Sequence, residues 1–376
     1  MKHRITVTVP GLIVVGALFA SSVQGAGFAL MEHSAQGIGR SYAGSVAGIE
    51  LESSIYYNPA GIAGATDPSV VAGSHLIMTS VDFDGGSTYA ASGAPLTGGD
   101  GGEAGVNSVV PNLYMVTGIS EDVAFGVGLF VPFGLATEYN AGWAGRYHAL
   151  ESSLHTVNLN PTLAWQINEK FSVGAGASAQ YASATLSSAI DFGSISGVAP
   201  GLLDGEGSLE GDDWGYGYNA GIIYAATPDT SVGLSYRSKI KHTLEGDAEF
   251  TVPAPVLALA QSQNMFVNTT GTADLELPAS ATLGGLQKVN EKVSVMFDLA
   301  WTEWSSFDEL RVQYDSAQPD SVTDESWKDT WRVSVGGEYA ASEAWTVRMG
   351  AAFDESPFPD TEHRTPRIPD SDRYWL

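Results

Sequence analysis

The sequence has 376 residues, no cysteine, 43 acidic side chains against 17 basic ones, and a formal net charge of −26. This charge argues against a nucleic acid as a partner, because a phosphate-binding surface needs clustered Lys and Arg. The lack of cysteine excludes disulfides and thiolate metal sites.

The chain begins with MKHRITVTVPGLIVVGALFASSVQG, which has the three parts of a secretory signal peptide. A basic start leads into an apolar run over residues 9–20, and small residues follow up to Gly25. We therefore expect residues 1–25 to be a signal peptide that is cleaved after Gly25. Beyond it no apolar run is long enough for a spanning helix, and the mean hydropathy is +0.00. The exported chain is then either a secreted soluble protein or an outer-membrane β-barrel.

Residues 26–67 show no regular alternation and carry seven glycines between short apolar pieces. The segment is too small to form a domain of its own. Its apolar content, which includes Phe28, argues against a solvated tail. We expect it to fold as a plug inside a barrel; the alternative is a segment that hangs in the periplasm.

A helix start lies near the end of this segment, at Asn58-Pro59-Ala60. Asn accepts a backbone N–H at the N-cap, and Pro suits the first helical turn. Gly61 and Gly64 stop the pattern at once. We therefore expect a single turn, capped by Asn58 and bent by Pro59, that acts as a hinge or latch of the plug.

Most of the chain from residue 68 onward alternates apolar and polar side chains with a period of two, as β-strands do. The stretches HTVNLNPTLAWQI, KFSVGAGASAQY, KVSVMFDLAW and WRVSVGGEY show this best, and their apolar faces begin or end in Trp, Tyr or Phe. This pattern indicates a lipid-facing band between aromatic girdles, with polar side chains toward a lumen. A soluble β-sandwich also alternates and is the alternative.

The connections between these stretches are alternately short and long, as in bacterial outer-membrane barrels. The long ones, rich in Asp, Gly and Ser, cover roughly residues 84–105, 138–152, 187–213, 246–271, 304–326 and 355–370. We count about eleven strands and the start of a twelfth at DRYWL. Bacterial single-chain barrels close with an even number of strands and leave no edge in lipid. We therefore expect C-terminal strands to be missing; the alternative is a very short twelfth strand that ends at Leu376.

Three stretches resemble the FadL family of outer-membrane long-chain fatty acid transport proteins: AGFALMEHSAQGIGRSYAGSVAGIELESSIYYNPAGIAG, GVGLFVPFGLATEYNAGWAGRYHA and YRSKIKHTLEGDAEF. The resemblance covers the whole mature chain. It implies an all-β fold, a transmembrane antiparallel β-barrel of fourteen strands. Residues 26–67 would be an N-terminal hatch in its lumen and residues 68–376 the barrel, without about the last three strands. It also implies ligand capture by extracellular loops, binding in the lumen, rearrangement of the hatch and lateral release into the membrane.

The fourth long loop carries apolar side chains where an exposed loop would be polar. They are Val256, Leu257, Leu259, Met265 and Phe266. Exposed apolar patches mark binding surfaces, so we predict that these residues bind the ligand. The alternative is that they pack the loops against each other. Phe28 in the hatch segment is a further candidate ligand contact.

The stretch GVGLFVPFG predicts an interrupted strand. Pro132 cannot donate a hydrogen bond to a neighbouring strand, and a Pro within a strand marks interrupted pairing. We expect Val131 and Phe133 on the outer face and propose a lateral gate at Phe130, Val131, Pro132, Phe133 and Gly134. The resemblance implies an inward kink here; the alternative is a bulge near the rim.

A carboxylate ligand needs a cation in an otherwise apolar site. Alternation places Arg237 and Lys239 on the inner face of VGLSYRSKI, and Arg332 and Arg348 face inward on later strands. We select Arg237 and Lys239 as the ligand-binding cations. The alternative is that lumen cations pair with acidic lumen residues such as Glu338.

The sequence contains no histidine pair with metal-ligand spacing and no G-x-S-x-G motif. We expect no enzymatic activity, no metal and no cofactor. The expected function is passive uptake of long-chain fatty acids or similar hydrophobic small molecules through the bacterial outer membrane. The other expected partners are outer-membrane lipid with lipopolysaccharide and the barrel-assembly machinery. Two alternatives are an uptake channel for aromatic or alkane hydrocarbons, which needs no lumen cation, and a plugged barrel with a structural or adhesive role.

Overall fold

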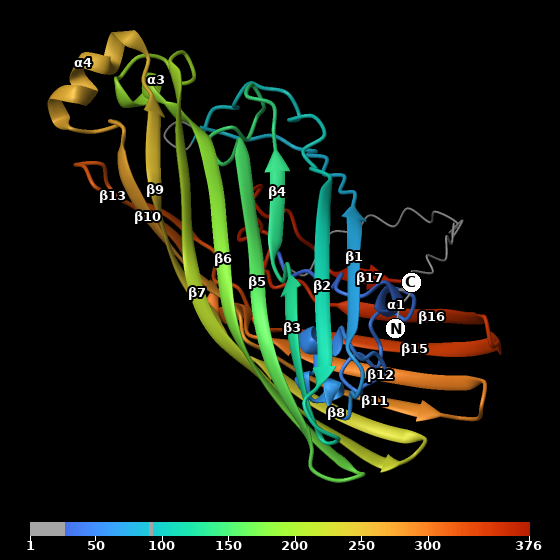
Figure 1. Cartoon of the computed structure of the whole chain (residues 1–376). Coiled ribbons are helices and arrows are strands. Elements are labelled where there is room, and N and C mark those ends of the chain that lie inside the picture. The colour runs from blue at the N-terminus through green and yellow to red at the C-terminus, as the bar shows by residue number, and fades with distance from the viewer. Residues whose placement is uncertain (1–26, 90–92) are drawn as a thin grey trace, which may run out of the picture.

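The computed structural model describes residues 27–89 and 93–376 (Figure 1). The predicted signal peptide and its cleavage site lie outside these residues. One sheet of seventeen strand segments makes up most of the described chain, and its ladders are antiparallel. No helix in the described ranges has the length and apolar character needed to cross a bilayer.

The segments follow one another in chain order around a curved wall (Figure 1). Seven rows of the wall are continuous: β1 (Ser69–Ile77), β2 (Ser108–Gly118), β5 (Glu151–Gln166), β6 (Phe171–Asp191), β7 (Asp204–Thr227), β16 (Trp345–Asp354) and β17 (Arg373–Trp375). Five rows are interrupted and consist of two segments each: β3 (Val123–Phe130) with β4 (Gly134–Glu138), β8 (Thr230–Arg237) with β9 (Ile240–Thr251), β10 (Thr269–Leu277) with β11 (Ser280–Lys288), β12 (Val293–Thr302) with β13 (Glu309–Tyr314), and β14 (Ser321–Asp324) with β15 (Thr330–Ser342).

The seventeen segments thus make twelve rows, of which β17 has only three residues. This confirms the prediction of about eleven strands and the start of a twelfth. In the described part of the chain, no ladder joins β1 to β16 or β17. The rows therefore form an open, curved wall.

The wall is apolar outside and polar inside. In β5, Val157, Leu163 and Trp165 are exposed, whereas Asn158 and Asn160 are buried. The buried amides bond to one another across strands; Asn160 Nδ2 donates to Asn219 Oδ1 of β7 at 2.9 Å. A soluble sandwich buries its apolar face instead, so this inverted pattern indicates a wall that faces lipid.

Aromatic side chains bound the apolar belt at both ends. Phe171 and Tyr224 stack with ring centroids 4.7 Å apart near the short turns. Near the opposite boundary, Trp301 of β12 and Trp331 of β15 are direct cross-strand neighbours. The segments β9, β10, β13 and β14 continue beyond this second row (Figure 1). At the far end of the wall, α3 (Phe192–Ile195) joins β6 to β7 and α4 (Ala254–Gln263) joins β9 to β10. This upper part of the wall therefore stands outside the membrane-spanning belt.

The segment before β1 folds against the inner face of the wall as short turns: α1 (Ala35–Ile38), α2 (Ser54–Tyr57) and the 3₁₀ turn η1 (Pro59–Ile62). The turn η1 lies against β5, β6 and β7. Glycines of the wall allow this close approach, because a Cβ at Gly174 would lie 2.4 Å from the carbonyl carbon of Pro59. Similarly, a Cβ at Gly221 would lie 1.9 Å from Asn58 Oδ1. We call residues 27–67 the hatch segment.

Candidate functional site

The hatch segment begins inside the gap between β3 and β4. The N–H of Leu30 donates to the carbonyl of Pro132 at 2.9 Å, and the N–H of Gly134 donates to the carbonyl of Phe28, also at 2.9 Å. Ala29 forms an isolated antiparallel bridge with Phe133. Four residues, 27–30, thus replace the pairing that the interruption at Pro132 removes.

The interruption itself was expected, but the expected orientation of Phe133 is wrong. Phe133 is buried inside the wall, where its ring centroid lies 6.1 Å from that of Phe28. The alternation of inward and outward side chains, which has a period of two residues, fails across Val131 and Pro132, because these residues belong to neither β3 nor β4. Thr156 of β5 stabilises the backbone at this interruption, because its hydroxyl donates a hydrogen bond to the Phe133 carbonyl at 2.6 Å.

Phe28 sits at the centre of an aromatic cluster. Its ring centroid lies 4.8 Å from Trp304 and 5.6 Å from both Phe307 and Trp327. Gly27 precedes it with a φ of +62°, and a Cβ there would lie 2.6 Å from the indole of Trp304. The predicted ligand residue Phe28 is therefore packed tightly in the lumen. The sequence did not indicate its partners, because Trp304 begins residues 304–326 and Trp327 directly follows them, and this stretch has the composition of a polar loop.

Three cavities adjoin this cluster, and a fourth lies farther out. The outermost has a volume of about 170 Å³ and is lined by Phe250, Phe266 and Gln318 among others. It shares Leu209 and Leu310 with an inner apolar cavity of about 60 Å³, whose floor includes Phe28. These shared lining residues connect the loops near α4 with the hatch segment.

The third cavity, of about 350 Å³, adjoins the gap between β3 and β4. It shares Phe28, Leu135 and Ile368 with the inner apolar cavity. Its lining also includes Val109 and Val157, which are 67% and 41% exposed on the outer face of the wall. The cavity therefore reaches from the lumen to the lipid-facing surface.

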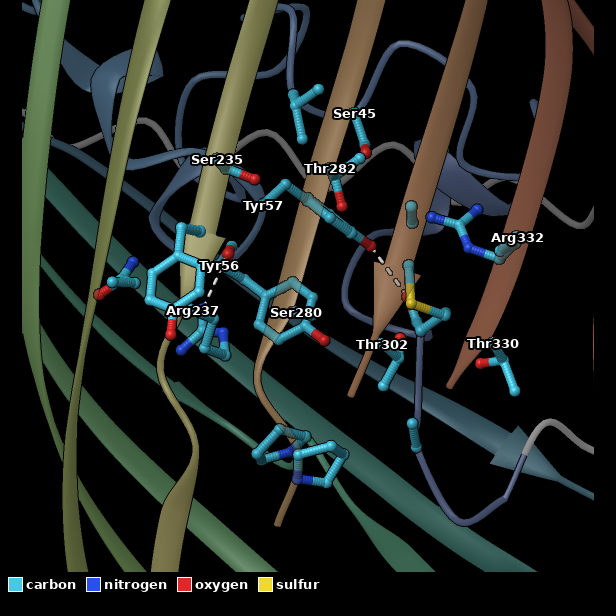
Figure 2. Close-up of a pocket in the computed structure, with 18 of the residues that line it drawn as sticks. Ser45, Tyr56, Tyr57, Ser235, Arg237, Ser280, Thr282, Thr302, Thr330 and Arg332 are labelled. Atoms are coloured by element: carbon cyan, nitrogen blue, oxygen red, sulfur yellow. Dashed lines mark hydrogen bonds between the residues drawn. The ribbon is translucent and has the colours of Figure 1, made fainter. Parts of the chain in front are cut away.

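The fourth cavity, of about 90 Å³, lies between the hatch segment and β8, β11, β12 and β15 (Figure 2). Tyr56 and Tyr57 of α2 project into it, opposite hydroxyl side chains of the wall (Figure 2). The hydroxyls belong to Ser235, Ser280, Thr282, Thr302 and Thr330. We call it the polar cavity; the outermost cavity also has polar lining residues, among them Ser187, Gln318 and Thr323.

Arg237 lines the polar cavity (Figure 2). Its Nη2 donates to the carbonyl of Tyr56 at 2.8 Å, and its guanidinium carbon lies 4.8 Å from the Tyr56 ring centre and 5.4 Å from that of Phe130. Its Nη1 is buried without a hydrogen-bond partner. Among the described residues, no carboxylate lies within 4 Å of Arg237 or of Arg332 in the same cavity.

The predicted inward orientation of Lys239 is wrong. Its side chain is 45% exposed and its Nζ lies 2.5 Å from Glu276 Oε1 on the outer surface, where Lys241 also contacts Glu276. The interruption between β8 and β9 shifts the alternation by one residue, so that Ile240 and not Lys239 is buried. The structure therefore does not bring Arg237 and Lys239 together.

The predicted loop residues have different positions. Val256 is buried, whereas Leu257 and Leu259 of α4 are exposed. Phe266 lines the outermost cavity, with its ring centroid 4.9 Å from that of Phe192 and 5.8 Å from that of Phe250. Met265 lies beside it and is partly buried. The buried Val256 agrees with packing of the loops against each other, and the exposed Leu257 and Leu259 agree with an apolar binding surface.

Asn58 has the expected capping role in the 3₁₀ turn. Its Oδ1 accepts from the N–H of Ala60 at 3.1 Å. Its Nδ2 also donates to two carbonyls, that of Val46 in the hatch segment at 2.7 Å and that of Ile222 in β7 at 3.1 Å. One side chain therefore ties the turn both to the hatch segment and to the wall.

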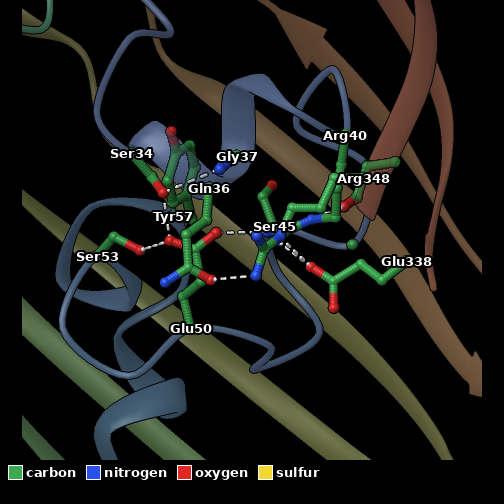
Figure 3. A network of polar contacts seen from close by, with 12 residues as sticks. Ser34, Gln36, Gly37, Arg40, Ser45, Glu50, Ser53, Tyr57, Glu338 and Arg348 are labelled. Carbon is green, nitrogen blue, oxygen red and sulfur yellow. Dashed lines mark hydrogen bonds and ion pairs between the residues drawn. The ribbon is translucent and has the colours of Figure 1, made fainter. Parts of the chain in front are cut away.

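A buried ionic network holds the body of the hatch segment (Figure 3). Arg40 is 1% exposed, forms an ion pair with Glu50, and donates from Nη1 to Glu338 Oε1 of β15 at 2.8 Å. Arg348 of β16 donates to the same oxygen at 2.6 Å and to Gln36 at 3.0 Å. The expected lumen pair of Arg348 with Glu338 is present, but no sequence pattern indicated Arg40 and Glu50, which lie outside any strand.

A second anchor lies on β12. Asp298 accepts hydrogen bonds from the N–H of Gly44 at 3.1 Å and from the N–H and hydroxyl of Ser45 at 2.9 and 2.5 Å. Together with Asn58 and Arg40, this contact fixes residues 34–62 to the wall at three places. Residues 27–30 are held by the two backbone hydrogen bonds at the gap and by the packing of Phe28 in the aromatic cluster.

Two buried carboxylates lie above the membrane-spanning belt, near the aromatic cluster. Burial raises the pKa of Glu325 to about 7, even though the indole N–H of Trp327 donates to it at 3.1 Å. Burial likewise raises the pKa of Asp370 to about 7. The N–H of Gly27 donates to Asp370 at 2.7 Å. The first described residue of the hatch segment is thus bonded to a carboxyl whose charge depends on pH.

Comparisons with known proteins place this arrangement in a family. The family described as outer membrane protein transport protein (OMPP1/FadL/TodX) matches residues 16–376. The long-chain fatty acid transport protein of Escherichia coli O6:H1 is 32% identical over 398 residues, which cover 100% of this chain and 87% of that protein. Outer membrane protein P1 of Haemophilus influenzae is 27% identical over 389 residues, 95% of this chain and 83% of that protein.

Solved structures share the fold. A FadL homologue of Pseudomonas aeruginosa superposes with a TM-score of 0.86 at 26% identity, covering 93% of this chain and 85% of that one. The toluene transporter TodX of Pseudomonas putida has a TM-score of 0.64 at 20% identity, covering 88% and 86%. The protein is located in the bacterial outer membrane. The chain belongs to the outer membrane protein transport protein family (OMPP1/FadL/TodX).

Proposed function

We propose that this protein mediates passive uptake of long-chain fatty acids or similar hydrophobic compounds through the outer membrane. The ligand is captured near α4, enters the inner apolar cavity, and meets Phe28. It then leaves sideways through the gap between β3 and β4. Relatives named long-chain fatty acid transport proteins support this ligand class.

The observation that carries the proposal is the state of Arg237. A buried guanidinium without a counter-ion is costly, and a carboxylate supplies both the charge and the missing acceptor for Nη1. The inner apolar cavity suits an alkyl chain, and Phe133 and Trp304 of the aromatic cluster also line the polar cavity of Arg237. An unpaired cation on the far side of the aromatic cluster from an apolar cavity fits an amphipathic acid.

Lateral release is supported by the cavity that reaches the outer face at Val109 and Val157. Residues 27–30 close it; two backbone hydrogen bonds join them to the gap, Gly27 bonds to Asp370, and Phe28 packs in the aromatic cluster. The hatch rearrangement that we propose is a movement of residues 27–30, whereas the contacts of Arg40, Asp298 and Asn58 keep the body of the hatch segment in place.

Uptake of radiolabelled oleate by a deletion strain, with and without the full-length protein, tests this function. Restored uptake and growth on oleate are expected. Undiminished uptake and growth without the protein would favour a plugged barrel with a structural or adhesive role.

A channel for aromatic or alkane hydrocarbons is the second candidate, and the likeness to toluene transporters in fold favours it. Such ligands need no cation, so their uptake should be insensitive to the loss of Arg237. Contacts with lipopolysaccharide and with the barrel-assembly machinery remain predictions from the barrel architecture.

A further inference from the structure

The connection between β16 and β17, residues 355–372, is not the exposed extracellular loop that its composition predicts. It folds inward across the upper lumen. The hydroxyl of Thr137 in β4 donates to the carbonyl of Arg367 at 3.2 Å, and the hydroxyl of Tyr139 donates to the carbonyl of Pro366 at 2.9 Å. Ile368 is 6% exposed and packs in the aromatic cluster around Phe28. The connection thus places Arg367 inside the ligand path proposed above.

The guanidinium of Arg367 lies where the two upper cavities meet. It lines both the outermost cavity of about 170 Å³ and the inner apolar cavity of about 60 Å³. Among the described residues that line either cavity, Arg367 is the one with a charged side chain. Anything that passes from Phe266 to Phe28 therefore passes this cation.

Arg367 has no ion-pair partner within 4 Å in the described ranges. Its Nη1 donates to the hydroxyl of Ser152 at 3.1 Å and to the carbonyls of Ser187 and Glu151 at 3.4 and 3.5 Å. These acceptors orient the group but do not neutralise it. The charge of Glu325 acts on Arg367 from a greater distance.

We propose that Arg367 binds the anionic headgroup of the ligand at the neck between the two upper cavities, before the headgroup reaches Arg237. A guanidinium fork binds a carboxylate through paired, charge-assisted hydrogen bonds. The alkyl chain then rests against Phe250 and Phe266 in the outermost cavity. Arg367 thereby selects amphipathic anions over neutral hydrocarbons at the entrance. This inference rests on the proposed function and adds a second, outer cation to the path.

The test compares ligands that share a chain but differ in charge. Binding of oleate and of oleyl alcohol is measured on the purified full-length protein and on Arg367→Met, Arg367→Lys and Lys328→Met. Loss of a charge-assisted hydrogen bond should weaken oleate binding by Arg367→Met about tenfold. Oleyl alcohol binding should change less than about twofold, and Arg367→Lys should recover most of the oleate affinity. Lys328→Met, which removes an exposed cation paired with Glu355, should match the wild type.

The outcomes separate two failures. If Arg367→Met weakens both ligands equally, the residue merely positions the inward connection, and the inference is overturned. Unchanged oleate affinity in Arg367→Met overturns it as well. If the wild-type protein binds neither ligand, the proposed function fails and this inference fails with it. Circular dichroism and thermal melting of each variant show whether an effect arises from misfolding.

Discussion

At the residue scale, the environment of Arg237 gives the clearest indication of a bound ligand. It is stacked on Tyr56 and Phe130, and one of its nitrogens is buried without an acceptor. We expect Arg237→Ala to weaken oleate binding tenfold to a hundredfold, because a charge-assisted hydrogen bond contributes roughly 1.5–3 kcal/mol. Fluorescence displacement on the purified protein measures this.

Lys239→Ala is the matched control for Arg237→Ala. Both changes remove one positive charge, two residues apart, but Lys239 pairs with Glu276 on the outer surface. The control should bind oleate as the wild type does. Equal losses in the two variants would show that general charge, and not the polar cavity, controls binding.

These two residues also show how far the sequence can lead. A period of two places Arg237 correctly on the inner face. It misplaces Lys239, because the break between β8 and β9 adds one residue to the count and nothing local marks it. For the same reason Phe133 was predicted on the outer face and is buried instead, although Pro132 indicated an interruption at this position. Alternation predicts the orientation of side chains within a strand and fails at these two interruptions of the ladder.

At the element scale, the hatch segment divides into a mobile candidate, residues 27–30, and an anchored body. A disulfide between Ala29→Cys and Phe133→Cys would lock the first part onto the wall. These residues form an antiparallel bridge. Directly opposed residues have Cα atoms about 4.5–5.5 Å apart, within disulfide range. The chain has no cysteine of its own, so no other pairing competes.

We expect the oxidised double variant to lose nearly all oleate uptake and the reduced protein to recover it, because the gap opens only when residues 27–30 leave it. Uptake is measured in cells before and after a reductant is added. The two single-cysteine variants serve as controls. Full uptake by the cross-linked protein would show that the ligand takes a different exit.

The anchored body leads to a prediction for Asn58. Asn58→Ala removes the cap on Ala60 and two hydrogen bonds, one to Val46 and one to Ile222 of β7. Each contributes about 1 kcal/mol, so the hatch segment should loosen while the strand ladders persist. Uptake should fall with normal amounts of protein in outer-membrane fractions. If the protein fails to assemble instead, the turn is a folding element and not a latch.

At the scale of the whole molecule, the sequence predicts the strands of the wall well but does not predict which segments fold into the lumen. Strand number, the apolar outer face and the aromatic girdles all follow from side-chain periodicity. The inward fold of residues 355–372 does not, because its Asp, Pro and Arg content reads as a solvent-exposed loop. Its burial depends on contacts with Thr137, Tyr139 and the aromatic cluster, which are distant in sequence. Such long-range contacts leave no local pattern.

The last prediction concerns the pH dependence of the whole fold. Burial raises the pKa of Glu325 from an ordinary 4.5 to about 7, against the opposing influence of Trp327, Arg367 and His363. The folded state therefore favours the protonated carboxyl. This stabilisation is fully present below pH 4.5 and is lost as the pH rises through about 7. The change in the free energy of unfolding is on the order of 3 kcal/mol.

We expect the melting temperature of the wild type to fall between pH 5 and pH 8, and the slope to be shallower in Glu325→Gln. The variant must be compared at each pH, because the net charge of −26 adds self-repulsion in the same direction. Asp370, whose pKa is also raised to about 7, should leave a residual slope in the variant. Calorimetry across this range measures both curves. Parallel curves would mean that Glu325 has the same pKa in the folded and unfolded states, and that the upper lumen is hydrated and not dry.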